Sequence, residues 1–113
     1  MLVNSSNEIN HGKIIVAPEV TMAIVRQATQ NISNVASMVS PTTNIFRRNQ
    51  GRDGVTLTQS EDGLKIDIYV ILKQNTNMVE TAKTIQVAVS DAVDQLIGIQ
   101  LTAVDVHVED VTF

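Results

Sequence analysis

The chain has 113 residues, close to the commonest size of one domain, so it leaves no room for two independent hydrophobic cores. Its net charge of −4 opposes the phosphate backbone of nucleic acid and gives no attraction to an anionic membrane surface. The complete absence of cysteine excludes disulfides, thiolate metal sites and cysteine nucleophiles, and it agrees with a protein of a reducing compartment.

The N-terminal residues are polar and lack hydrophobic periodicity, so we expect a flexible arm over 1–11 and a single domain over 12–113. The β-branched residues of the run KIIVA, 13–17, predict a strand. Pro18 then suits the first turn of a helix, which the spacing of apolar residues extends to about Asn31. The expected buried stripe of this helix consists of Val20, Ala23, Ile24 and Ala28.

The segment 32–54 keeps no clean hydrophobic period, so we interpret it as irregular, with a short extended piece possible at 35–39. It contains the only basic cluster of the chain, formed by Arg47, Arg48 and Arg52. Guanidinium groups bind phosphate and carboxylate, and nearby glycines let backbone N–H groups approach an anion. This loop is therefore a candidate anion-binding site. The alternative is a solvated loop whose charges pair with the acidic body of the protein.

Alternating apolar and polar residues predict a β-hairpin over 55–73, in which Asp62 and Gly63 supply the turn. After a short polar turn, Asn77 can cap a second helix, with Glu80 three residues later as in a capping box. Apolar residues at three- and four-residue spacing place the buried stripe of this helix at Met78, Ala82, Ile85, Val89, Ala92 and Leu96.

Gly98 suits the left-handed residue that ends such a helix, and valines then alternate with charged residues over 104–109 in a last strand. The expected order of elements is therefore β-α-β-β-α-β. This order indicates a single α+β domain in which two helices pack on one face of a mainly antiparallel sheet.

The face of the sheet turned away from the helices, here called the open face, is the candidate interaction face. If the strands pair as expected, seven residues share it: Thr56, Thr58, Asp67, Tyr69, Ile71, Asp105 and His107. Tyr69 and Ile71 among polar neighbours form a mixed patch that suits a contact with another subunit or with an anchor protein. Partial cover by the loop 32–54 is the alternative.

Asp105, His107 and Glu109 alternate on the last strand and include residue types that bind zinc or manganese. Neighbouring side chains on one strand face lie roughly 6.5 to 7 Å apart, which is too far to share an ion without a ligand from another strand. We therefore interpret them as a solvated face and expect no metal or other cofactor. The chain also lacks any Ser-His-Asp, Cys-His or paired-carboxylate arrangement on loops, so we do not expect an enzyme.

Three blocks of the sequence carry a family resemblance: GKIIVAPEV at 12–20, DGLKIDIYVIL at 62–72, and the segment 79–111. In the third block, a helix with an Ile-Gln-x-x-Val core is followed by Gly-Ile and by a strand of alternating valines. Together these blocks resemble the alkaline shock protein family, the envelope stress response proteins of low-GC Gram-positive bacteria.

The resemblance implies a non-enzymatic role in stress response or envelope homeostasis, with the chain itself or a membrane anchor protein as partner. With no signal-like start and no apolar run long enough to cross a bilayer, the sequence favours a cytoplasmic protein. Recruitment to the inner face of the membrane by such a partner and a purely cytosolic role explain the lack of a membrane segment equally. The alternative function is a module that binds a small ligand or nucleic acid through the arginine loop or the open face. The net charge of −4 and the presence of only three aromatic residues oppose a nucleic-acid module.

Overall fold

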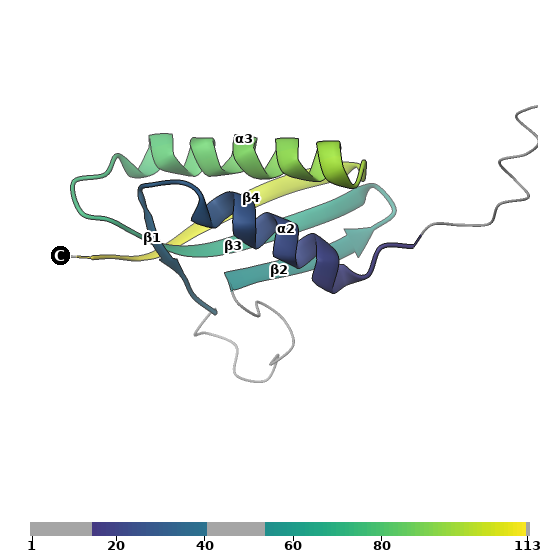
Figure 1. Ribbon diagram of the computed structural model, residues 1–113, viewed down its shortest axis with the longest axis horizontal. Helices are drawn as coiled ribbons and strands as arrows, with labels where there is room; N and C mark the ends of the chain where they lie inside the picture. The colour runs from purple at the N-terminus through teal and green to yellow at the C-terminus, as the bar shows by residue number, and fades with distance from the viewer. Residues whose placement is uncertain (1–14, 41–53, 113) are drawn as a thin grey trace, which may run out of the picture.

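The computed structural model describes residues 15–40 and 54–112. In chain order the elements are helix α2 (Pro18–Gln30), strands β1 (Val35–Met38), β2 (Val55–Ser60) and β3 (Gly63–Leu72), helix α3 (Met78–Leu96) and strand β4 (Leu101–Val111). Figure 1 shows the strands as one sheet with both helices packed against it. The α+β class expected from the sequence is confirmed.

Strand β3 forms the centre of the sheet and pairs with all three other strands. β1 and β2 pair with β3 in antiparallel orientation, whereas β4 pairs with it in parallel along residues 64–72. β4 pairs with one edge of β3 along nearly its whole length. β1 and β2 therefore both pair with the opposite edge, β2 along residues 63–68 and β1 along residues 70–72. Helix α3 supplies the crossover that a parallel pair requires. The sheet is thus mainly antiparallel, as predicted.

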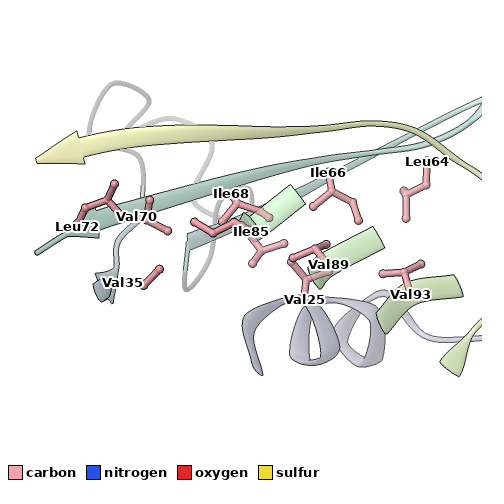
Figure 2. Packing of buried hydrophobic residues seen from close by; sticks show 11 residues of the cluster. Val25, Val35, Leu64, Ile66, Ile68, Val70, Leu72, Ile85, Val89 and Val93 are labelled. Atoms are coloured by element: carbon pink, nitrogen blue, oxygen red, sulfur yellow. The ribbon is translucent and has the colours of Figure 1, made fainter. Parts of the chain in front are cut away.

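Both helices pack on one face of the sheet: α2 lies over β1 and β2, α3 lies over β4, and the helices contact each other. The side chains of alternate β3 residues point toward the helices (Figure 2), as the period of two residues in a strand requires. The buried core cluster between the layers consists of Val25, Val35, Val55, Leu64, Ile66, Ile68, Val70, Leu72, Ile85, Val89 and Val93.

The β-hairpin is confirmed, with Glu61 and Asp62 in the turn and Ser60 paired with Gly63. Gly63 has a φ of 136°, a left-handed conformation that L side chains rarely adopt. A Cβ at this position would also lie only 2.6 Å from the Gln100 carbonyl oxygen. Glycine is therefore required here both for the turn and for the close approach of the chain before β4.

The strand expected in the run 13–17 is wrong for its described residues, 15–17, which form no strand. Ile15 is 85% exposed, although its β-branched side chain favours an extended backbone. The physical reason is that strand propensity produces a strand only where a neighbouring strand completes the hydrogen bonds. The first strand of the described chain is β1, the short extended piece that the sequence allowed, so the described order is α-β-β-β-α-β.

Helix α2 begins at Pro18 and ends at Gln30, as predicted, but its buried stripe is rotated relative to the expected one. The buried residues are Thr21, Val25 and Thr29, whereas Val20 remains 49% exposed. A buried threonine is tolerated because the Thr29 hydroxyl donates a 2.8 Å hydrogen bond to the Val25 carbonyl oxygen. Of the expected stripe, Ala28 packs against the core, whereas Val20 and Ala23 are exposed, so the prediction was wrong in part.

Helix α3 is capped as predicted, since the Asn77 side chain accepts a 3.0 Å hydrogen bond from the Glu80 backbone N–H. Gly98 follows with a φ of 75°, the left-handed conformation expected at the helix end. Of the expected stripe, Ile85 and Val89 are fully buried. The two ends of that stripe are wrong: Met78 and Leu96 are 50% and 70% exposed, and Thr81 and Val93 are buried in their place.

Candidate functional site

The open face is the side of the sheet opposite the two helices. The strand register places Thr56 beside Asp67, Asp67 beside Asp105, and Tyr69 beside His107. Paired residues of neighbouring strands project from the same side of a sheet, so side chains from β2, β3 and β4 meet here although the sequence separates them widely.

Asp67 and His107 form the most closely defined contact of this face. His107 Nε2 lies 2.9 Å from Asp67 Oδ1, and the side chain of Asp67 is only 12% exposed against 41% for His107. The carboxylate accepts this hydrogen bond when Nε2 carries the imidazole proton. A nearly buried acceptor therefore receives its partner from another strand, which fixes the orientation of the imidazole ring.

Tyr69 completes this arrangement by stacking on His107. The two ring centroids are 4.5 Å apart and the ring planes differ by 13°. Side chains stacked in this way lose their rotamer freedom before any partner arrives, which lowers the entropic cost of binding. The stack thus presents a preformed aromatic surface, and the other large hydrophobic side chains of the described residues are aliphatic.

Lys65 also belongs to this face, and the sequence analysis missed it. Its Nζ lies 3.4 Å from Asp105 Oδ2 and 3.9 Å from Asp67 Oδ1. The signal that could have identified it is its position two residues before Asp67, on the same side of β3. Because Lys65 and Asp105 are both almost half exposed, this ion pair organises the surface and adds little stability.

The environment of Tyr69 raises the pKa of its phenol above the ordinary value. Burial is the largest cause, followed by the negative charge of Asp67, and the charge of Glu109 acts in the same direction. A hydrogen bond with the Thr56 side chain and the charge of Lys65 oppose the increase in pKa. Tyr69 is therefore neutral near pH 7, and its hydroxyl is available for hydrogen bonds.

The other candidate residues lie in less constrained positions. Ile71 is half-buried and sits beside Ser37 of β1 and Asp110 of β4, whereas Thr58 is exposed beside Lys65. The arginine cluster at 47, 48 and 52 lies outside the described residues. The candidate anion-binding loop therefore stays a prediction.

The described part of the open face brings several titratable side chains close together. Across residues 15–40 and 54–112, no group of three or more His, Cys, Asp or Glu side chains is placed to hold a metal ion. What these side chains provide is an aromatic pair, a partly exposed isoleucine and a surrounding set of charges. Such a combination of amphipathic rings and a polar rim is typical of protein contact surfaces.

Comparison with known families gives a match over residues 6–113 to the alkaline shock protein 23 family, described as having a cell envelope-related function. The resemblance drawn from the sequence blocks is thereby confirmed. The uncharacterized protein YloU of Bacillus subtilis is 27% identical over 107 residues, which are 89% of each chain. The uncharacterized protein Spy1535 of Streptococcus pyogenes is 30% identical over 102 residues, covering 88% of this chain and 79% of that protein.

Solved structures with a similar fold include MamM-CTD 215-293, with a TM-score of 0.52 and 16% identity over 83% of this chain and 99% of that chain. A zinc form of the MamM CTD has a TM-score of 0.51 and 16% identity, covering 84% of this chain and 87% of that chain. At such identities the likeness concerns the fold alone.

Among the described helices, neither has the length and apolar character needed to cross a bilayer.

Proposed function

This chain belongs to the alkaline shock protein family, and from that premise we propose that it is a non-enzymatic protein of cell-envelope homeostasis, acting as an interaction or scaffold domain. In this proposal it works in the cytoplasm, where it binds copies of itself or is recruited to the inner face of the membrane by an anchored partner. The binding surface is the open face of the sheet.

The observation that supports this proposal best is the stack of Tyr69 on His107, held in place by Asp67. Aromatic side chains supply much of the contact energy at protein interfaces, because they bury a large area at a small entropic cost. Tyr69 is the only tyrosine of the chain. Its ordered contact with His107 lies on the side of the sheet that neither described helix covers.

Ile71 extends this patch along β3, and Thr56 and Thr58 border it on β2. A partly apolar centre with hydroxyl groups at its edge matches the usual anatomy of a protein interface. The half-buried state of Ile71 is consistent with a residue that becomes fully covered when a partner binds.

The test is an affinity pull-down of the tagged chain from a lysate of its own organism, with membrane and soluble fractions kept separate. The variant Tyr69→Ala, Ile71→Ser removes the patch. The matched control is Val87→Ser, which removes a 60% exposed apolar side chain from α3 on the opposite layer. We expect recovery of a membrane anchor protein or of the chain itself, lost in the double variant and retained in the control.

Retention of the same partner by the double variant would contradict the proposal. Recovery of only nucleic acid or a phosphorylated ligand, lost when Arg47, Arg48 and Arg52 are changed to glutamine, would support the binding-module alternative instead. Circular dichroism of each variant shows whether the fold persists, so that a lost partner can be assigned to the surface.

A further inference from the structure

On the open face, the described strand residues carry more negative than positive charge. Within the four described strands, Lys65 is the only lysine or arginine, whereas the carboxylates are Asp67, Asp105, Glu109 and Asp110. Lys65 is already paired with Asp105 at 3.4 Å. Glu109 and Asp110 are exposed. Among the described strand residues, one ammonium group therefore faces four carboxylates, three of them from β4, and Lys73 follows directly after β3.

These charges surround the stacked rings. Asp110 is paired in register with Ile71, and Tyr69 is paired with His107, so the carboxylates border the same patch that the proposed function uses. The charge of Glu109 is close enough to Tyr69 to act on the ionisation of its phenol. A ligand on this patch would therefore meet an aromatic surface and negative charge at the same time.

We propose that the open face binds an arginine-bearing segment of its protein partner. A guanidinium group complements the excess of carboxylates, forms paired hydrogen bonds with a carboxylate, and packs well against aromatic rings. A lysine ammonium satisfies the charge but neither the paired geometry nor the ring contact as well. This inference rests on the proposed function, since it specifies the chemistry of the partner that the open face recognises.

The first test uses a synthetic probe, an acetylated and amidated hexapeptide in which arginine alternates with threonine, titrated into the ¹⁵N-labelled full chain and followed by NMR. We expect saturable shifts of amides from β3 and β4, including Lys65, Tyr69 and His107. The same peptide with lysine in place of arginine should bind at least about threefold more weakly, because it loses the paired hydrogen bonds and the ring contact. Equal binding of the two peptides would overturn the inference, as would no binding at millimolar peptide.

The second test compares two charge-matched variants. Asp105→Asn, Glu109→Gln removes two carboxylates from the open face, and Asp91→Asn, Asp94→Asn removes two exposed carboxylates from α3. We expect about tenfold weaker binding of the arginine peptide for the first variant, since each exposed ion pair contributes roughly threefold. The second variant should lose less than about twofold, because its carboxylates act only through the screened net charge.

Equal losses in both variants would mean that the peptide responds only to net charge, and the inference would fail. The pull-down described above distinguishes this failure from a failure of the proposed function. If a protein partner is still recovered and is still lost with Tyr69→Ala, Ile71→Ser, the open face remains an interaction face and only its preference for arginine is wrong.

Discussion

Replacing Ile68 by alanine tests the central claim of the fold, that the two helices cover one particular face of β3. Ile68 is fully buried, lies between Val55 and Val106 in the sheet, and belongs to the same core cluster as Ile85 of α3. Ile71, three residues later on the same strand, projects from the open face and is only half-buried. The pair therefore compares one residue type on the two faces of a single strand.

The expected costs follow from burial. Ile68→Ala removes three buried carbons, worth about 2.4 kcal/mol at ~0.8 kcal/mol each. A residual cavity of roughly 50 Å³ adds about 1.2 kcal/mol at ~24 cal/mol per Å³, which gives a total of about 3.6 kcal/mol. Ile71→Ala removes the same atoms from a partly exposed site and leaves no closed cavity, so we expect a smaller cost of about 1.5 kcal/mol.

Urea denaturation monitored by circular dichroism measures both costs as changes in the free energy of unfolding. A domain of this size is typically stable by about 5–15 kcal/mol, so both variants should remain folded in the absence of denaturant. The slope of the free energy with urea concentration should stay unchanged, because the surface exposed on unfolding is nearly the same. Equal costs for the two variants, or a larger cost for Ile71→Ala, would refute the assignment of the helices to this face.

Two further predictions concern single side chains. The folded state raises the pKa of Tyr69, so the folded chain holds the phenol proton more tightly than the unfolded chain. The free energy of unfolding is therefore unaffected below about pH 10 and decreases as the pH rises through the folded pKa. Phenolate absorbance reports this single tyrosine, and a midpoint no higher than in the urea-unfolded chain would contradict the prediction. Asn77→Ala removes the acceptor for the Glu80 N–H and should cost about 1 kcal/mol, whereas Asn77→Ser should retain most of the stability. Equal urea midpoints for these two variants would show that the cap contributes nothing.

The parts of the fold that were predicted correctly are those with local signals. The hairpin depends on a two-residue turn before Gly63, and the start of α3 depends on Asn77 and Glu80 within one turn. Such signals act over three or four residues, so they are visible in the sequence. The strand expected before α2 does not form at the described residues 15–17. Its β-branched residues needed a neighbouring strand, and no local signal reports whether a neighbour exists.

In the candidate site, too, local features could be predicted from the sequence and contacts between strands could not. Alternation along β3 and β4 is sufficient to place Asp67, Tyr69 and His107 on the polar side of their strands. It did not predict that the imidazole of His107 would lie 2.9 Å from Asp67, nor that Lys65 would bridge toward Asp105. These contacts depend on the register between two strands that are joined through a helix of 19 residues.

The sequence by itself determined the family, the α+β class and the side of each strand on which a residue lies, because backbone geometry sets a period of two in every strand. Only the tertiary structure decided which strands are neighbours and in what register they pair. The parallel pairing of β3 with β4 unites residues 40 positions apart into one surface. This register depends on the packing of the whole core, because the burial of β3 against both helices fixes the register in which β4 can pair with it.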